Sequence, residues 1–90
     1  MSPESRVTIS PSVYARSFGE ELVLLDFNRG EYFALDAIGA RVWRSLEQGR
    51  TIAEAADAIV VTHEVSRDRA LADVTDLVTH LANESLVAVC

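Results

Sequence analysis

The spacing of apolar residues changes once along this chain, near residue 35, and this change constrains the fold more than any other feature. Before it, apolar and polar residues alternate over 13–18, a short apolar segment follows at 22–25, and an aromatic-rich segment follows at 31–35, as in β-strands. After it, apolar residues recur every three or four positions, as on the buried side of α-helices. Strands grouped before helices predict an α+β domain rather than an alternating parallel sheet.

The three predicted strands are joined by two short turns. Gly19 in the first turn, and Asn28 and Gly30 in the second, tolerate the left-handed backbone conformation that tight turns need. Connections this short predict an antiparallel meander. The segment Leu22–Leu25 is continuously apolar, which favours a strand that is buried on both faces.

Three helices follow the strands, and each predicted helix start carries a capping residue. Asp36, Thr51 and Ser66 can each accept a hydrogen bond from the first turn, and Glu54 can complete a capping box with Thr51. The β-branched residues at 60–62 predict that the second helix frays there.

Two further short apolar segments lie near the ends of the chain. Val7–Ile9 alternates within an entry segment that can hold a short strand. Leu86–Val89 fits either a last extended stretch or a loosely packed tail. No repeat or linker divides the sequence, so we expect one domain over 1–90, with residues 1–6 flexible.

Composition excludes several classes of protein. The net charge is −6 and the eight basic residues are arginines spread along the chain, so we expect no binding to nucleic acid. No apolar run approaches the roughly 20 residues of a membrane span, and the first residues lack a signal-peptide pattern. These patterns predict a cytoplasmic protein with no membrane partner. The one cysteine, Cys90, excludes an internal disulfide.

No set of residues stands out as catalytic or metal-binding. The four glycines are isolated, so there is no glycine-rich phosphate loop. His63 and His80 lie outside metal-ligand spacing and fit surface positions, and acidic residues such as Asp57 and Asp76 fit solvated helix faces. We therefore predict no catalytic residues, no metal and no cofactor, and favour binding over catalysis.

The last predicted strand is the first of two features that suit peptide binding. It ends the meander, so it can lie at the edge of the sheet with free N–H and C=O groups, to which a partner can add a strand. The alternative is that neighbouring helices cover this edge. The candidate residues are Glu31, Tyr32, Phe33, Ala34 and Leu35, with backbone partners expected from the central three.

The third helix is the second feature, because its apolar residues cover an arc of about 140°, wider than one packing seam requires. On the binding interpretation, the flank with Leu77 fills the core, while Leu71 and Val78 border a groove with Val74 between them. On the alternative interpretation the whole stripe packs into the core. The candidate groove and rim residues are Arg67, Leu71, Asp73, Val74 and Val78.

The segment Leu24–Asp36, followed by Gly39–Trp43, resembles the PqqD-like family: a leucine-rich strand, a turn ending in glycine, a Tyr-Phe strand and a helix start before an aromatic residue. The helix start at Arg50–Ile52 and the segment Ala72–Val74 extend the resemblance over roughly residues 7–89. One departure is Asp36, where the family commonly has asparagine, but either side chain caps a helix. The resemblance implies a winged-helix-like fold, with a three-stranded antiparallel sheet followed by three helices.

The resemblance also implies a function. Members are recognition elements for the precursors of ribosomally made, modified peptides, and the leader peptide adds as a strand beside the third strand and lies against the third helix. The short, acidic, stand-alone form is similar to proteins of lasso-peptide pathways, where a separate leader peptidase, followed by a cyclase, is the working partner.

Three alternatives stay open on the sequence. The first is a PqqD-like partner of a radical-SAM or other modifying enzyme. The second is a winged-helix transcription regulator, against which the net charge argues. The third is a small hydrolase, for which no nucleophile and base can be named.

Overall fold

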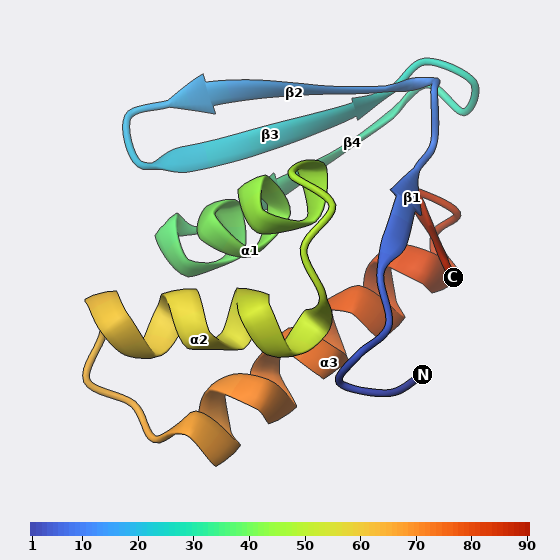
Figure 1. Ribbon diagram of the computed structural model, residues 1–90. Helices are drawn as coiled ribbons and strands as arrows, with labels where there is room; N and C mark the ends of the chain where they lie inside the picture. Colours follow the sequence, from blue (N-terminus) through green and yellow to red (C-terminus); the bar gives the residue numbers. More distant parts are fainter.

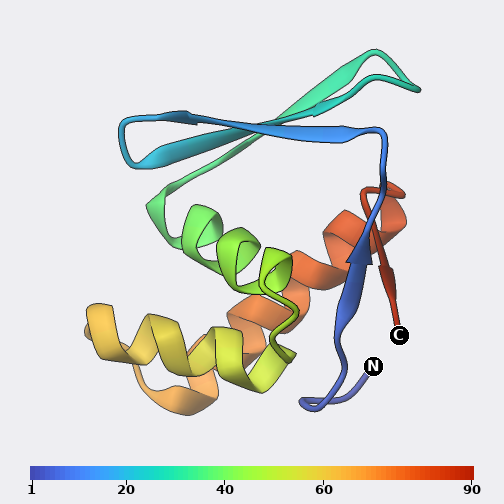
Figure 2. The ribbon, with the colours of Figure 1, turned by 45° about the horizontal axis from the view of Figure 1, so that its top comes forward.

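The computed structural model describes residues 1–90 and has two antiparallel sheets and three helices. The strands are β1 (Val7–Ile9), β2 (Val13–Phe18), β3 (Glu21–Asp26), β4 (Glu31–Leu35) and β5 (Val87–Val89). The helices are α1 (Ala37–Glu47), α2 (Ile52–Thr62) and α3 (Arg67–Asn83). Figures 1 and 2 show the β2–β3–β4 sheet as one layer, with the helices against one of its faces. The predicted α+β class, a three-stranded antiparallel sheet followed by three helices, is confirmed.

The meander is closed by glycines at its two turns. Gly19 and Gly30 have φ values of 62° and 64°, so both turns use the left-handed region as expected. Asn28 does not take a positive φ; its backbone N–H instead donates to the buried carboxylate of Asp26 at 3.1 Å. The same carboxylate accepts from the Ser12 hydroxyl at 3.2 Å, which fixes the base of the second turn.

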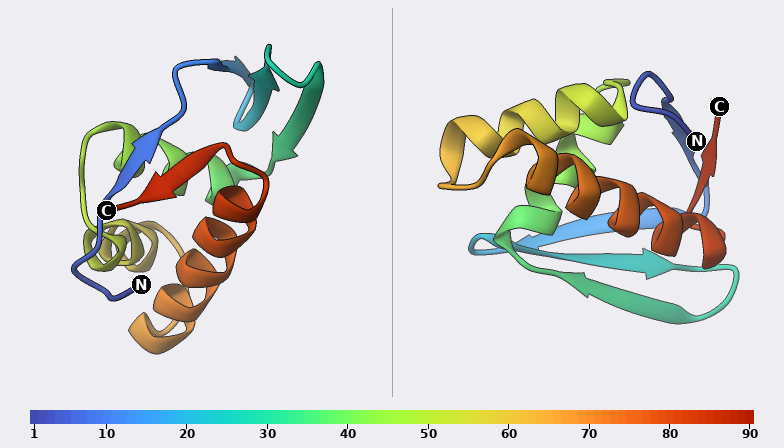
Figure 3. Two further views of the ribbon diagram at one scale, coloured as in Figure 1. Left: turned by 90° about the vertical axis from the view of Figure 1, so that its right-hand side faces the viewer. Right: turned by 90° about the horizontal axis from the view of Figure 1, so that it is seen from below.

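Only one face of the sheet is buried. Leu22 and Leu24 of β3 face the helices and are 1% and 0% exposed, whereas Val23 and Leu25 are half-buried on the opposite face. The prediction that this strand is buried on both faces is wrong, because all three helices lie on the same side of the sheet (Figure 3). The uncovered face carries four exposed aromatic residues: Tyr14, Phe18, Phe27 and Tyr32.

The three predicted caps are confirmed. Asp36, Thr51 and Ser66 each accept a hydrogen bond from the backbone N–H three residues later, at 2.8, 3.1 and 3.2 Å. Glu54 completes the capping box by accepting from the Thr51 N–H at 2.8 Å. These bonds satisfy N–H groups that a helix start would otherwise leave without partners.

The C-terminal end of α2 differs from the prediction. The helix continues through Thr62, so the fraying expected at 60–62 is wrong. Val60 packs against the core, and the Thr62 hydroxyl donates to the Ala58 carbonyl at 3.1 Å. Tertiary packing thus overrides the weak helix preference of β-branched residues.

One apolar core joins the sheet to the helices. Trp43 is its largest fully buried side chain, at 1% exposed, and its indole N–H is a buried polar group without a hydrogen-bond partner. The largest fully buried side chains come from β3, all three helices and the segment before β5: Trp43, Leu22, Leu24, Leu46, Ile52, Leu81, Leu86, Val42, Val74 and Val78.

The two ends of the chain meet in the second sheet. β1 pairs antiparallel with β5, with Val7 opposite Val89, so the short strand and the last extended stretch both form (Figure 3, left). The carbonyls of Pro3 and Ser5 accept hydrogen bonds from the first turn of α2. The flexibility expected for residues 1–6 stays a prediction. None of the three helices combines the length and apolar character needed to cross a membrane.

Candidate functional site

The outer edge of β4 is unpaired. The strand order β2-β3-β4 places β4 at the sheet edge, where its only strand partner is β3. In the β2–β3 hairpin, Phe18 lies opposite Glu21, and the loop between them has two residues. The pair that flanks a two-residue loop is hydrogen-bonded. Hydrogen-bonded and non-hydrogen-bonded pairs alternate along antiparallel strands.

When this alternation is followed across β3, it shows which backbone N–H and C=O groups of β4 are free. Residues 21, 23 and 25 of β3 bond to β2, so residues 22, 24 and 26 bond to β4. The bond from the Phe27 N–H to the Ser12 carbonyl, at 3.1 Å, fits the same alternation. The backbone groups of Phe33 therefore point toward β3, whereas those of Tyr32 and Ala34 point to the open edge. The open edge thus offers two N–H donors and two C=O acceptors. Phe33, which was expected to supply a backbone partner, does not face that edge.

An apolar groove lies beside the end of β4. It has a volume of about 500 Å³ and nine hydrophobic residues among the twelve that line it. We name it the β4–α3 groove; its residues are Ala34, Leu35, Asp36, Ile38, Gly39, Val42, Ile59, Val65, Ala70, Asp73, Val74 and Leu77. Ala34 belongs to both features, so the groove opens next to the free backbone groups of β4.

At Gly39, which lines this groove, α1 packs closely against the end of β4. A Cβ atom at this position would lie 3.1 Å from the Leu35 Cβ and 3.4 Å from an Asp36 carboxylate oxygen. The missing side chain therefore lets the first turn of α1 pack against the end of β4. This approach keeps the strand edge and the groove adjacent.

The side chains of the five candidate residues of β4 lie in three different surroundings: the groove, the core and the solvent. Ala34 and Leu35 line the groove, while the Phe33 ring is half-buried against the core. Tyr32 is 72% exposed on the uncovered face of the sheet. Glu31 is exposed and forms an ion pair with Arg29 at 3.4 Å.

The groove runs along the opposite flank of α3 from the expected one. Val74 lines the groove as expected, but so does Leu77, which was assigned to the core. Val78 is 0% exposed and lies in the core, and Leu71 is half-buried away from the groove. Within the flank that was assigned to the core, Ala70 and Leu81 are both 1% exposed, and Leu77 packs against the core while it also lines the groove.

The two candidate rim residues also separate. Asp73 lines the groove and lies 3.4 Å from the Arg69 guanidinium. The Arg67 side chain instead donates to Asp57 of α2 at 2.8 Å, and this hydrogen bond raises the pKa of Arg67 above its ordinary value. Arg67 therefore links α3 to α2 and does not line the groove.

Sequence reasoning missed the groove residues of α1, together with Ile59 of α2 and Val65. Ile38 and Val42 were counted only as members of the apolar side of the first helix, yet both line the groove, and Ile38 is 36% exposed. The sequence could have identified Ile38 as a groove residue, since it stands in the first helical turn after β4.

A polar link joins the β3–β4 turn to the end of α3. The Arg29 guanidinium donates to the Glu84 carbonyl at 2.7 Å and lies 3.6 Å from the Glu84 carboxylate. Together with the ion pair to Glu31, this arginine holds the turn against the helix that borders the groove.

The chemistry of the groove is that of a binding surface. Asp36 and Asp73 are its only ionisable side chains, and the Asp36 carboxylate is engaged as a helix cap. No group of three or more His, Cys, Asp or Glu side chains in residues 1–90 is arranged to hold a metal ion. Free backbone groups beside an apolar groove suit an extended, partly apolar segment.

The fold and site define a small α+β module with an open strand edge beside a helical groove. The sequence pattern of the family described as coenzyme PQQ synthesis protein D (PqqD) matches residues 21–87, and the chain belongs to this family. The resemblance found in the sequence is thus confirmed. No match was found among curated proteins.

Two solved structures are similar over nearly the whole chain. The first is TbiB1 in complex with the TbiA(beta) leader peptide, with 39% identity and a TM-score of 0.83 over 88% of this chain and 92% of that one. The second is lasso peptide synthetase B1 complexed with the leader peptide, with 28% identity and a TM-score of 0.85 over 92% of this chain and 98% of that one.

Proposed function

We propose that this protein binds the leader segment of a ribosomally synthesised precursor peptide, of the lasso class, and delivers it to a separate leader peptidase. The observation that carries the proposal is the free edge of β4 beside the β4–α3 groove. Both similar structures are complexes with a leader peptide, which supports the same ligand class for this chain.

The proposed mode of binding is strand addition. An extended leader pairs antiparallel with β4 through the outward backbone groups of Tyr32 and Ala34. Alternate side chains of the leader then point toward the helices and enter the groove beside Leu35, Val74 and Leu77. The backbone bonds provide affinity for any extended chain, and the apolar pockets select the sequence.

Delivery needs no catalytic group on this protein. A leader held on β4 raises the local concentration of the precursor at an enzyme that also contacts the complex. The protein alone should therefore leave the precursor uncut, and it should accelerate cleavage by the peptidase. Mass spectrometry of the precursor with this protein, with the peptidase, and with both measures this; cleavage by this protein alone would contradict the proposal.

A pair of proline variants tests the strand-addition site. Ala34→Pro removes an N–H that points to the open edge, so pairing with β3 is kept while one leader bond is lost. Ala15→Pro is the matched control, since β2 is the other edge strand and the Ala15 N–H points outward there by the same alternation.

The measurement is the affinity for a fluorescein-labelled leader by fluorescence polarisation, with circular dichroism to check the fold. We expect Ala34→Pro to weaken binding roughly tenfold or more, because the ring also strains the strand, and Ala15→Pro to bind like wild type. Equal affinities of two folded variants would place the leader elsewhere.

A further inference from the structure

Arginines without a carboxylate partner gather on the outer side of α1. Arg29, Arg67 and Arg69 form ion pairs, and the other five arginines have no carboxylate oxygen within 4.0 Å. All five are exposed, and three of them lie on α1 or just after it: Arg41, Arg44 and Arg50. We name this surface the arginine face. It is a concentration of positive charge on a chain whose net charge is −6.

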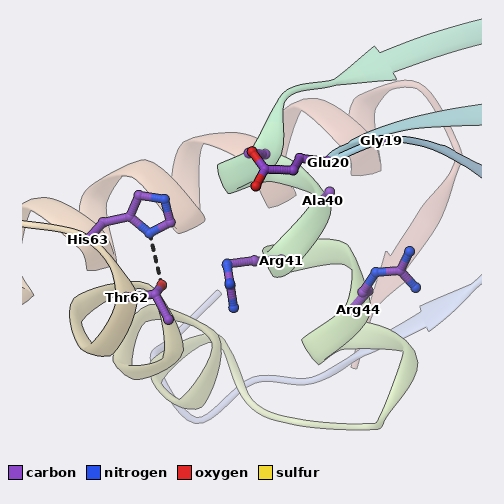
Figure 4. Close-up of a pocket in the computed structure, with 8 residues that line it drawn as sticks. Gly19, Glu20, Ala40, Arg41, Arg44, Thr62 and His63 are labelled. Atoms are coloured by element: carbon purple, nitrogen blue, oxygen red, sulfur yellow. Dashed lines mark hydrogen bonds between the residues drawn. The ribbon is translucent and has the colours of Figure 1, made fainter.

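The arginine face is hollowed. A depression of about 460 Å³ lies between α1, the β2–β3 turn and the end of α2, and a second one of about 250 Å³ adjoins α1 and Arg50. Arg41 and Arg44 line both. Figure 4 shows the Arg41 side chain in the space between α1 and the Thr62–His63 pair, whose side chains share a hydrogen bond of 2.8 Å.

Neither Arg41 nor Arg44 has a carboxylate partner within the protein. Positions 41 and 44 are three residues apart on α1, and in Figure 4 their side chains extend in different directions from the helix. Arg44 donates to the Ser17 hydroxyl, a neutral acceptor, and Arg41 has no hydrogen-bond partner. Glu20, at the rim, is the one carboxylate that lines either depression. A bound carboxylate would supply the charged partner that these arginines lack.

We propose that the arginine face binds an acidic segment of the enzyme that acts on the bound peptide, an inference that rests on the proposed function. Guanidinium groups bind carboxylates through paired hydrogen bonds, so aspartate and glutamate side chains fit this surface. The depressions share no residue with the β4–α3 groove. Leader and enzyme would therefore occupy separate surfaces.

The charge distribution favours a short acidic protein segment over nucleic acid. Duplex DNA presents a long row of phosphates and needs an extended basic surface. This chain carries 14 acidic residues against eight arginines, and its net charge of −6 would repel a polyanion. A segment with a few carboxylates contacts the arginines alone.

Matched charge reversals test this inference. Arg41→Glu and Arg16→Glu change the net charge equally, and both arginines are exposed without a hydrogen bond or ion pair, but Arg16 lies on β2, outside both depressions. The probe is the leader peptidase of the cleavage assay, labelled and titrated with each variant in the presence of saturating leader. We expect Arg41→Glu to weaken peptidase binding roughly tenfold, mostly at low salt, and Arg16→Glu to leave it unchanged.

Leader affinity, measured on the same variants, separates this inference from the proposed function. Both variants should bind the leader like wild type. Equal peptidase affinities, or loss of leader binding by Arg41→Glu, would overturn the inference while the proposed function stands. Failure of the wild-type protein to bind the leader would overturn both. Sedimentation of the wild type as a dimer that Arg41→Glu dissociates would make a second copy the occupant, which also overturns the inference.

Discussion

Leu77 and Leu71 are both half-buried on α3, but only Leu77 lines the β4–α3 groove. This pair allows a matched test of the apolar wall. Leu77→Asp should weaken leader binding roughly tenfold to a hundredfold, because the loss of one buried aliphatic contact costs about 1.5–3 kcal/mol. Leu71→Asp should change leader affinity little. Fluorescence polarisation measures both affinities, and similar losses for the two folded variants would remove the groove from the site.

Single residues with local roles could be assigned from the sequence. Gly19 and Gly30 were predicted as turn residues and Asp36 as a cap, because turns and caps depend on neighbouring backbone alone. Val78 could not be assigned in this way. Its burial depends on which side of α3 meets the other helices, and the apolar stripe is wide enough for either orientation.

The contribution of the capping box at the start of α2 to the stability of the protein depends on pH. Hydrogen bonds from the backbone N–H and side chain of Thr51 lower the pKa of Glu54 below its ordinary value of 4.5. A carboxylate with a lowered pKa in the folded state stabilises the protein above its unfolded pKa, and this contribution is lost as pH falls through the folded pKa.

Comparison with Glu54→Gln isolates this effect, because every other carboxylate is present in both proteins. The wild type should be more stable than Glu54→Gln above about pH 4.5, and the difference should shrink as the pH falls below that value. Urea unfolding at a series of pH values, followed by the fluorescence of the single tryptophan, gives the two free energies of unfolding. A difference that does not depend on pH would contradict the assignment.

At the scale of elements, the sequence could not predict which distant segments pair with each other. β1 and β5 could each be expected as extended segments, but their pairing joins residues about eighty positions apart and leaves no local signal. The same holds for β3, whose apolar run is compatible with burial on one face or two. The helices decided this by covering one side of the sheet.

At the scale of the whole molecule, two surfaces of different chemistry lie on neighbouring sides of α1. The β4–α3 groove is apolar and borders free backbone groups, while the arginine face is polar and positively charged. Apolar contact and backbone pairing are weakly screened by salt, whereas exposed charge pairs are strongly screened. The two proposed partners should therefore respond differently to ionic strength.

This difference gives a prediction for the intact protein. Affinity for a labelled leader should fall only modestly from low to high salt, because the groove has a single carboxylate that is not a helix cap, Asp73. A labelled DNA duplex should show no tight binding near physiological salt, because a net charge of −6 repels phosphates and few counterions would be released.

Fluorescence polarisation at several salt concentrations measures both ligands under the same conditions. A steep salt dependence for the leader would mean that charge, and not the β4 edge and its groove, supplies most of the binding energy. Submicromolar binding of the duplex would instead favour a nucleic-acid partner for this fold.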